Sequence, residues 1–436
     1  MKIEKIVPGG QGLGTNADGR KVFLWNALPG EEVEEFEITK KKSKYLEGIA
    51  TKISKKSEHR VGPKDECFLA TSPWQIFDYD FELKTKAEIV REVFRQNGIE
   101  VSTPEVVTDG KEWNYRNKME YALYWDVSEE KIKLAFHQRG SHRKVPISQS
   151  SIERPEIYES AEKIVSELNE RHEEARKYQS LLLRTSQIGE VSGGLYENGK
   201  AHSEFPSLSD EIFGISYNYS PNGFFQINLP VYQMALEEIR KEVGDSEKVL
   251  DLYSGVGTIG LSVARNRDLT LVECNKDAYR ELERNCFVAG SFPESNFFST
   301  DSRRASSSLR QLNKNASDDV ISSGSCNGRE EDKEKIDSKK MTKLHSVLAK
   351  SEDVLEYIEP EMTVILDPPR AGCDKKLLER ILGVLPPKVI YLSCNPATQA
   401  RDAAILAEKY HIKNMKAFNF FPKTPHIENL VVFERN

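Results

Sequence analysis

The chain has 436 residues, of which 38% are hydrophobic and 30% are charged, and its formal net charge is -7. This length predicts two to four domains, and the composition is that of a globular protein. No apolar run approaches the roughly 20 residues of a membrane-spanning helix, which excludes an integral membrane protein. The acidic net charge gives no general sign of nucleic-acid binding, so any such role depends on local patches.

The N-terminus and the cysteines point to the cytoplasm. The first residues, MKIEKIVPGGQG, contain no apolar segment of about 7–15 residues, so we expect no signal peptide. The six cysteines are sparse and irregularly spaced, which argues against a disulfide scaffold. We therefore expect a cytoplasmic protein in a reducing environment.

Residues 1–56 are predicted to form a small all-β domain. Stretches typical of strands, at 21–25, 33–38 and 49–53, are separated by turn residues, and an OB-like barrel would close them without exposed edges. Residues 38–60 carry eight Lys or Arg against two Glu. This basic segment is either a solvated edge protected by lysines or a surface that contacts phosphates.

Residues 57–218 are predicted to form a second domain of mixed α/β structure. Apolar residues recur at every third or fourth position within 84–96 and 158–168, which predicts a helix in each. Between these helices, residues 118–125 and 131–136 are typical of strands.

Residues 219–436 show alternating strand and helix patterns, which predicts a largely parallel sheet covered on both faces. Residues 302–350 interrupt the alternation with ten Ser and no Phe, Trp or Tyr, so we predict a flexible insertion there. The expected strands are 248–253, 270–273, 362–366, 388–393 and 430–434.

The clearest local motif is VLDLYSGVGTIGLSVA at 249–264, in which an apolar strand leads through glycines into an apolar helix. Gly255, Gly257 and Gly260 let a ligand approach the backbone at the sheet edge where open α/β folds bind ligands. Glu273, at the end of the next strand, could accept both hydroxyls of a ribose. The spacing by itself fits a dinucleotide site or an S-adenosylmethionine site.

Three further strings place reactive side chains near strand ends. Asp367 and Cys394 each follow a predicted strand, and Glu428 precedes the last one. A single residue of this kind is often a packed cysteine or a helix cap. Three of them at the sheet edge that holds the glycine loop are hard to explain by packing, so we interpret them as an active site. The strings are VILDPPRAG (364–372), YLSCNPATQARD (391–402) and FFPKTPHIENLVVF (420–433).

With these motifs the chain resembles the RNA 5-methyluridine methyltransferases, which use S-adenosylmethionine to methylate C5 of uracil in transfer and ribosomal RNA. The resemblance implies a Rossmann-like class I methyltransferase domain, a mixed α/β central domain and an N-terminal TRAM domain, which is an OB-like RNA-binding module. SCNPAT together with TPHIE is its most specific part. The other strings that carry it are YRNKMEY (115–121), LAFHQRGSHRKV (134–145) and SPNGFFQIN (220–228).

The resemblance assigns catalytic roles to two residues. Uracil C5 is a poor nucleophile, and addition of a thiolate to C6 turns the ring into an enolate whose C5 can attack a methyl donor. This addition is assigned to Cys394. After transfer, a base must remove the proton from C5 so that the cysteine can leave, and this role is assigned to Glu428.

The resemblance also implies which residues surround S-adenosylmethionine. Asp367 is one of them, although it could equally contact the uracil, and Thr258 stands where some relatives have asparagine. The implied set is Gln226, Tyr253, Gly255, Gly257, Thr258, Glu273 and Asp367.

RNA is the partner that the resemblance implies, and we expect the protein to be a monomer. The target base must leave its stack to expose C5 and C6, and Phe224 and Phe225 either stack on a base or belong to the core. The basic segment 38–60 then becomes an expected RNA contact. Because TRAM-like domains occur in relatives that act on ribosomal RNA, we favour 23S ribosomal RNA over the T-loop of transfer RNA.

The central domain departs from the family pattern. Many relatives carry four cysteines there that hold an iron–sulfur cluster, whereas here the region contains only Cys67, and Ser148, Ser150 and Ser151 occupy the stretch of a later ligand. One cysteine cannot support a cluster with four ligands. We therefore expect no iron–sulfur cluster and a packed Cys67.

Two other classes of function fit parts of the sequence. A non-catalytic RNA-binding or assembly factor would use the first two domains, but it would not need Cys394, Asp367 and Glu428. An NAD-dependent oxidoreductase would use the glycine loop, but it would leave SCNPAT and TPHIE unexplained.

Overall fold

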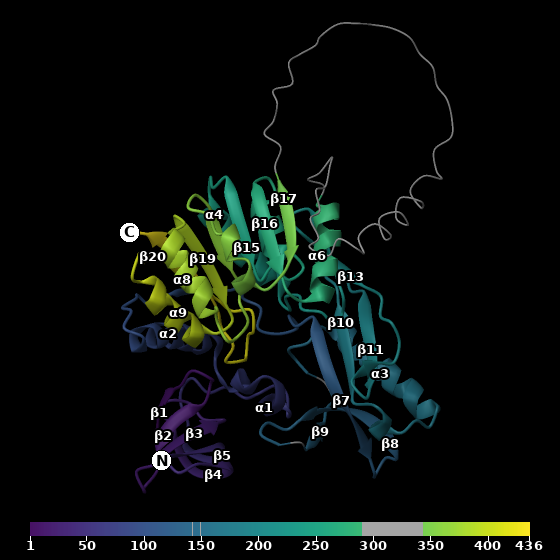
Figure 1. Cartoon of the computed structure of the whole chain (residues 1–436). Helices are drawn as coiled ribbons and strands as arrows, with labels where there is room; N and C mark the ends of the chain where they lie inside the picture. The colour runs from purple at the N-terminus through teal and green to yellow at the C-terminus, as the bar shows by residue number, and fades with distance from the viewer. Residues whose placement is uncertain (142, 149, 290–342) are drawn as a thin grey trace, which may run out of the picture.

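The computed structural model describes residues 1–141, 143–148, 150–289 and 343–436. In this part of the chain the strands form sheets of five, six, two and eight strands. Figure 1 shows the five-stranded sheet at the N-terminus, the six-stranded sheet beside it, and the eight-stranded sheet above both. No helix in these ranges is long and apolar enough to cross a membrane.

The N-terminal sheet closes on a small apolar core that includes Val22, Leu24 and Leu46. All three predicted strands are present, which confirms a strand-rich N-terminal region, and its identity as a TRAM barrel stays a prediction. The sequence prediction misses β1 and β2. In β2, glycines stand where apolar side chains would otherwise indicate a strand. A Cβ on Gly12 would lie 2.7 Å from the carbonyl oxygen of Ala27. In sheet order the strands are β1 (Ile3–Ile6), β2 (Gly12–Thr15), β3 (Lys21–Trp25), β5 (Tyr45–Lys55) and β4 (Glu32–Lys41).

The central sheet is antiparallel, and α3 (Pro155–Glu170) packs its apolar face on it. Both predicted strands and the predicted helix are confirmed, and the helix is longer at each end because Pro155 is well suited to a first turn. A short turn, η2 (Ala175–Lys177), precedes β10. In sheet order the strands are β12 (Lys200–Ala201), β11 (Val191–Glu197), β10 (Ser180–Thr185), β7 (Lys118–Asp126), β8 (Lys131–His137) and β9 (Lys144–Pro146).

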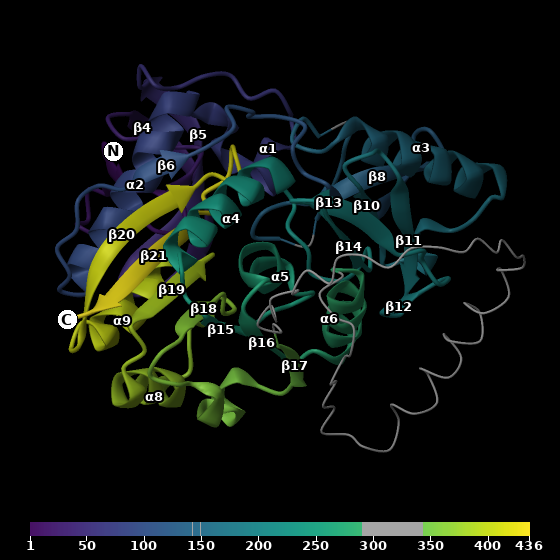
Figure 2. The ribbon, with the colours of Figure 1, turned by 90° about the horizontal axis from the view of Figure 1, so that it is seen from above.

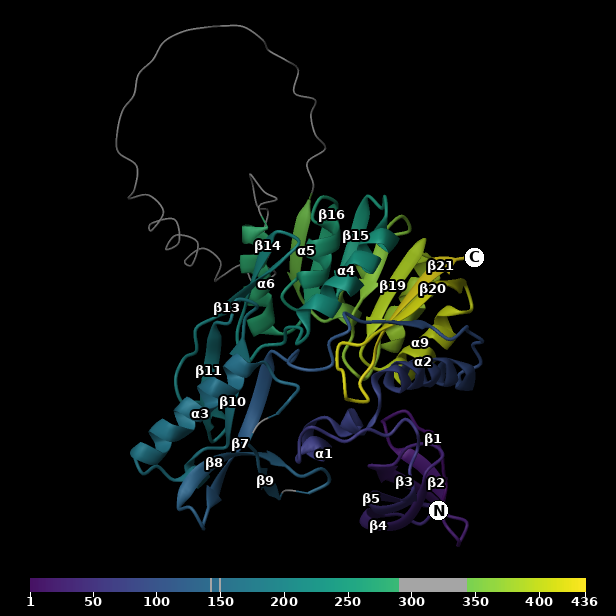
Figure 3. The same ribbon diagram turned by 180° about the vertical axis from the view of Figure 1, so that it is seen from behind.

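Helix α2 (Tyr79–Gln96) lies between the N-terminal sheet and the eight-stranded sheet (Figure 3). It begins before the predicted residue 84 because Asp78 caps it, accepting a hydrogen bond from the backbone N–H of Phe81 at 2.7 Å. Its residues Val90 and Phe94 join the core under the eight-stranded sheet. The two short helical segments before it are α1 (Phe68–Thr71) and η1 (Pro73–Ile76).

The eight-stranded sheet has apolar cores on both faces, as the alternation predicts. Helices α2, α8 (Lys375–Val384) and α9 (Pro396–Leu406) cover one face, and α4 (Leu229–Val243), α5 (Thr258–Ala264) and α6 (Lys276–Val288) cover the other (Figure 2). All neighbouring strands are parallel except where β21 pairs with β19 and β20. In sheet order the strands are β17 (Leu344–Leu348), β16 (Asp268–Glu273), β15 (Lys248–Leu252), β18 (Thr363–Leu366), β19 (Lys388–Ser393), β21 (Glu428–Arg435), β20 (Tyr410–Phe418) and β6 (Glu105–Val107).

This arrangement confirms the expected Rossmann-like α/β fold, in which the carboxyl ends of parallel strands meet at one edge. Residues of the expected central domain also belong to it, since β6 pairs with β20 and the hairpin of β13 (Leu208–Ile212) and β14 (Ile215–Tyr219) packs in its core. Two short turns, η3 (Ser351–Asp353) and η4 (Leu355–Tyr357), connect β17 to β18.

The prediction of a flexible insertion at 302–350 is wrong for its C-terminal end. Residues 344–348 form β17, which pairs in parallel with β16. This strand is at the sheet edge and contains His345 and Ser346, so its apolar pattern is weak. Residues 302–342 lie outside the described residues.

Candidate active site

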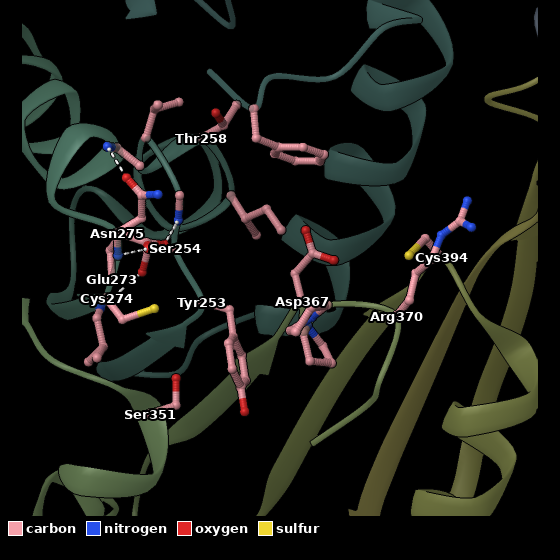
Figure 4. Close-up of a pocket in the computed structure, with 18 of the residues that line it drawn as sticks. Tyr253, Ser254, Thr258, Glu273, Cys274, Asn275, Ser351, Asp367, Arg370 and Cys394 are labelled. Atoms are coloured by element: carbon pink, nitrogen blue, oxygen red, sulfur yellow. Dashed lines mark hydrogen bonds between the residues drawn. The ribbon is translucent and has the colours of Figure 1, made fainter. Parts of the chain in front are cut away.

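A cavity of about 1550 Å³ opens at the carboxyl ends of β15, β16, β18 and β19. It is lined by every predicted site residue except Gly257, so the structure brings together side chains that are up to 202 residues apart, from Gln226 to Glu428. Figure 4 shows Asp367 between the side of the cavity that holds Tyr253 and the side that holds Arg370 and Cys394.

Glycines shape the loop after β15 in two different ways. Gly255 and Gly257 both have left-handed backbone angles, with φ of 57° and 87°. A Cβ on Gly257 would lie 2.5 Å from Cδ1 of Leu282, whereas a Cβ on Gly255 would meet nothing within 4 Å. Gly257 therefore serves the packing of the loop on α6, and Gly255 leaves the backbone open toward the cavity.

Two carboxylates hold this loop in place. Glu273, at the end of β16, accepts hydrogen bonds from the backbone N–H groups of Gly255 at 2.8 Å and Asn275 at 2.5 Å, as Figure 4 shows. Asp251 accepts one from the N–H of Gly260 at 2.9 Å, and burial raises its pKa to about 8. The Glu273 carboxylate thus faces the cavity in a fixed orientation.

Tyr253, Thr258 and Gln226 complete this side of the cavity. β15 ends at Leu252, one residue before the prediction, because Tyr253 has a φ of 64° that turns the chain out of the strand. Thr258 is buried as the first residue of α5. Gln226 is also buried, and its carbonyl oxygen accepts a hydrogen bond from Nδ2 of Asn117 at 3.1 Å.

The other side of the cavity holds the three reactive residues. Asp367 follows β18, Cys394 follows β19, and Glu428 is the first residue of β21, which begins earlier than predicted. Burial raises the pKa of Asp367 to about 7 and that of Glu428 well above its usual value, and Asp367 raises the latter further. Burial, followed by the charges of Glu428 and Asp367, raises the pKa of the Cys394 thiol to about 11.

Arg370 and His426 also line this side of the cavity, although the sequence analysis assigned them no role. The Arg370 guanidinium lies beside Cys394 (Figure 4), and its charge lowers the pKa of both Cys394 and Glu428. Nη2 of Arg370 is 3.3 Å from Nδ1 of His426. Burial and Arg370 lower the pKa of His426 to about 4, so this imidazole is neutral near pH 7. Arg370 lies in the motif DPPRAG and His426 in the motif TPHIE, so these motifs were the sequence signal that could have indicated them.

Known proteins are similar to this chain in sequence and in fold. The family model of tRNA (Uracil-5-)-methyltransferases matches residues 341–436. An uncharacterized RNA methyltransferase of Bacillus cereus is 27% identical over 97% of this chain and 95% of its own length, and one of Enterococcus faecalis is 25% identical over 100% and 97%. The crystal structure of a Pyrococcus abyssi tRNA (uracil-54, C5)-methyltransferase has the same fold, with a TM-score of 0.70 and 22% identity over 99% of this chain and 98% of that chain.

The chain is thus similar to tRNA (uracil-5-)-methyltransferases over residues 341–436 and to RNA methyltransferases over nearly its whole length.

The two phenylalanines of GFFQ have different environments. Phe225 is buried and stacks on Tyr219 with 4.0 Å between ring centroids. Phe224 is 72% exposed and lines the cavity. The two alternatives left open by the sequence are therefore divided between them, with Phe225 in the core and Phe224 free to contact a ligand.

Cys394 also lines a second, smaller cavity of about 280 Å³. Pro8 and Gly9 of the N-terminal sheet form part of its wall, together with Pro425 and His426. No sequence signal could connect Pro8 with Cys394, because nothing in the local pattern predicts how the N-terminal sheet docks.

The basic segment 38–60 is only partly a free positive surface. Lys40 pairs with Glu47 at 2.9 Å, and Lys52 pairs with Glu34 at 2.7 Å. Arg60 is largely buried, and its Nε donates to Oε1 of Glu31 at 2.6 Å. Arg60 therefore belongs to the packing of the N-terminal sheet, and the neighbouring glutamates of β4 neutralise part of the lysine charge.

The central region does not fit an iron–sulfur cluster. Cys67 packs in the core of the central sheet, and burial raises its pKa to about 12. Ser148 is exposed, whereas Ser151 donates through its backbone N–H and its hydroxyl to Asp65, at 2.9 Å and 2.5 Å. Within the described ranges, no group of three or more His, Cys, Asp or Glu side chains could hold a metal ion. The absence of a cluster stays a prediction.

Proposed function

We propose that this protein transfers a methyl group from S-adenosylmethionine to C5 of uracil in RNA, through a covalent bond between Cys394 and C6 of the base. The observation that carries this proposal is one cavity lined by the glycine loop and by Asp367, Cys394 and Glu428. The family supports it, and the Pyrococcus abyssi relative was crystallised with S-adenosyl-L-homocysteine, the product form of this methyl donor.

The loop side of the cavity fits the methyl donor, which supplies an electrophilic methyl group when bound. Gly255 offers an open stretch of backbone, and Glu273 presents a carboxylate already oriented by two N–H groups. We assign the ribose hydroxyls to Glu273. The remaining proposed contacts with the donor are Gln226, Tyr253, Thr258 and Asp367.

The other side of the cavity supplies the reaction with the base. Cys394 loses its proton, and its sulfur adds to C6 of uracil. The electron pair of the C5–C6 bond then forms a bond from C5 to the methyl group, whose bond to the sulfonium sulfur breaks, so that S-adenosylhomocysteine is the leaving group. Arg370 favours the thiolate, which burial and the neighbouring carboxyls otherwise disfavour. Asp367, with a pKa of about 7, is partly ionised near neutral pH and can accept the thiol proton.

Glu428 then removes the proton from C5, the C5–C6 double bond re-forms, and the sulfur leaves C6. A carboxylate with a raised pKa is a stronger base than an ordinary one once it is ionised. Glu428 is buried in the cavity wall, which shields its carboxyl group from bulk water. The exposed ring of Phe224 offers a stacking surface for the flipped base.

For the RNA substrate we propose ribosomal RNA, because the N-terminal all-β region resembles a TRAM domain. Transfer RNA is the second candidate, because the Pyrococcus abyssi protein of the same fold is a tRNA (uracil-54, C5)-methyltransferase. We keep the proposal of a cytoplasmic monomer, with RNA as its partner.

Tritium release from RNA labelled at uracil C5 tests this function, because methylation replaces the hydrogen at that carbon. Purified protein is incubated with S-adenosylmethionine and with labelled ribosomal or transfer RNA in parallel. Donor-dependent release from one RNA supports the proposal and names the substrate class. A protein that releases no tritium from either RNA overturns it.

A further inference from the structure

The loop between β20 and β21, residues 419–427, carries His426 and leads directly into Glu428. Within it, Lys423 has a φ of 61°, a left-handed backbone that residues other than glycine seldom adopt. Such a conformation costs free energy and persists only where its surroundings fix it. The residues that fix the Lys423 conformation lie before position 116 in the chain.

Glu82 of α2 fixes the backbone of this loop. Its two carboxylate oxygens each accept a hydrogen bond from the N–H of Lys423 at 3.0 Å, and Oε1 also accepts one from Nδ2 of Asn419 at 3.2 Å. The carbonyl oxygen of Lys423 accepts a hydrogen bond from the N–H of Trp74 at 3.0 Å. Both peptide groups around the strained residue are therefore held.

Two buried lysines complete the attachment. The Lys423 ammonium is 1% exposed, donates to the carbonyl oxygen of Phe77 at 3.1 Å, and pairs with Glu112 at 2.6 Å. Nζ of Lys86, which is fully buried, lies 3.0 Å from Glu82 and donates to the carbonyl oxygen of Phe421 at 3.0 Å.

Hydrogen bonds extend from this attachment to the active site. The carbonyl oxygen of Phe421 also accepts from the Thr424 hydroxyl at 2.8 Å, and that hydroxyl accepts from the N–H of His426 at 3.3 Å. The His426 ring in turn contacts Arg370, which lies beside Cys394. A shift of the Lys423 backbone would therefore move groups on the reactive side of the cavity.

We infer that Glu82, Lys86 and Lys423 form a clamp that positions His426 and Glu428 against Arg370 and Cys394. They are positioning residues, since none of them lines the cavity. Stability alone explains the clamp poorly, because buried ion pairs are often no more stabilising than apolar residues of the same volume. What the positioned groups then do rests on the proposed function.

The variant Glu82→Gln tests the clamp, because it keeps the side-chain shape but removes the charge and one acceptor. Glu359→Gln is the matched control, since Glu359 pairs with Lys248 at 2.5 Å on the surface, away from the cavity. With Glu82→Gln we expect kcat to fall by about 100-fold with KM for RNA and donor nearly unchanged. We also expect a covalent protein–RNA adduct to accumulate, because Glu428 is displaced from C5.

Hydrogen exchange of the loop 419–427 gives a readout that does not need activity. We expect faster exchange of these amides in Glu82→Gln than in Glu359→Gln or the natural protein. Unchanged exchange overturns the clamp. If the natural protein releases no tritium from either RNA, the proposed function fails, and the exchange result alone still decides whether the loop is clamped.

A double variant separates positioning from folding, in case Glu82→Gln destabilises the protein. Glu82→Met with Lys86→Met removes both charges at once, and we expect it to regain the thermal stability that Glu82→Gln loses. Under our inference its kcat stays low and its adduct persists. A double variant that regains both stability and kcat overturns the positioning role.

Discussion

The two sides of the cavity are built in different ways. Apart from Gln226, the predicted donor contacts of the loop side lie in the continuous segment 249–275, where a strand, a glycine turn and a second strand are joined by hydrogen bonds to Asp251 and Glu273. The reactive side combines Asp367 and Cys394, which follow β18 and β19, with Glu428, the first residue of β21, and with a loop held by α2. Local sequence thus determines the loop side, whereas the reactive side depends on long-range packing.

The carboxyl groups that line the cavity also differ between its two sides. On the loop side, two backbone N–H groups fix the orientation of the Glu273 carboxylate. On the reactive side, burial raises the pKa of Asp367 to about 7 and that of Glu428 well above its usual value. One side is prepared to bind, and the other holds groups that can exchange protons during a reaction.

The largest expected effect comes from removing the reactive thiol. Cys394→Ala should lower turnover by about 10⁴-fold or more, because the proposed mechanism forms the bond to C6 through this thiol. Donor affinity, measured by calorimetry, should stay within about twofold, because the loop side is untouched. Cys67→Ala, in the core of the central sheet, is the control and should retain turnover. Normal tritium release from Cys394→Ala would refute the covalent mechanism.

The next effect comes from the proposed base. Glu428→Gln keeps the shape of the side chain but cannot take the proton from C5, so turnover should fall by about 10²- to 10⁴-fold. Addition of Cys394 and methyl transfer do not need this base, so a covalent protein–RNA adduct should appear on a denaturing gel. The adduct must be absent from Cys394→Ala/Glu428→Gln. A slow variant without any adduct would assign the proton to another group.

A pair of glycine substitutions examines the loop side. Gly257→Ala should lower the free energy of unfolding by about 3 kcal/mol, because it combines a left-handed backbone with overlap of its Cβ with Leu282. Gly255→Ala should cost only about 1–2 kcal/mol, since its Cβ meets nothing within 4 Å. Its Cβ points to the space assigned to the donor, so donor affinity should fall by about tenfold or more.

Thermal unfolding and donor titration of both glycine variants check this pair. Gly257→Ala is predicted to be the less stable variant, and Gly255→Ala is predicted to have the weaker donor affinity. If Gly257→Ala weakened the donor more than Gly255→Ala at equal stability, the assignment of Gly257 to packing would be wrong.

The loop side shows how far sequence reasoning reaches. The glycine spacing and the apolar strands predicted β15, α5 and Glu273 because the hydrogen bonds that Asp251 and Glu273 accept in this loop lie within 25 residues of chain, from Asp251 to Asn275. The order of the parallel strands then brought Asp367 and Cys394 to the same edge. The family resemblance supplied their proposed roles.

The reactive side shows where such reasoning ends. Glu82 and Lys86 look like ordinary charged residues of an amphipathic helix, and nothing local indicates that both are buried against a loop more than 330 residues away. The strand β17 was missed because an edge strand needs little apolar sequence. Burial of polar residues is a property of the assembled fold, so periodicity cannot reveal it.

The pH dependence should separate activity from stability. Turnover should rise with pH, by about tenfold from pH 6 to pH 7 if a single deprotonation limits it, because Cys394 and Glu428 must lose protons and Asp367 has a pKa of about 7. Stability should fall over the same range. Asp251 and Asp367 have raised pKa values in the folded protein, so their contribution is complete below about pH 4 and is lost as pH rises through about 7 to 8.

His426 opposes this trend in stability, since its lowered pKa favours the folded protein as pH rises toward 6.5. Rates of tritium release and midpoints of thermal unfolding between pH 5.5 and 8.5 measure both profiles. Asp367→Asn should flatten the fall in stability. A protein whose stability rose from pH 6.5 to pH 8 would show that these carboxyls titrate normally.

The smallest expected effect tests whether the N-terminal sheet takes part in the reactive side. Gly9 and Gly10 both have positive φ, 111° and 96°, so alanine strains the backbone at either position. Only at Gly10 does a Cβ meet the reactive loop, 2.4 Å from Cβ of Pro425, whereas at Gly9 it meets nothing within 4 Å. Gly10→Ala should therefore push Pro425 and the neighbouring His426 away from Cys394.

We expect Gly10→Ala to lower kcat by about fivefold relative to Gly9→Ala, with equal donor affinity, because a displacement of a few tenths of an ångström weakens alignment without removing a reacting group. Rates of single-turnover tritium release compare the two variants, each at a temperature at which both have the same free energy of unfolding. Equal rates would mean that the N-terminal sheet only rests against the loop. A slower Gly10→Ala would mean that residues near both ends of the chain together align the Cys394 thiol and the Glu428 carboxyl. The glycine loop, by contrast, needs no contribution from the N-terminal sheet.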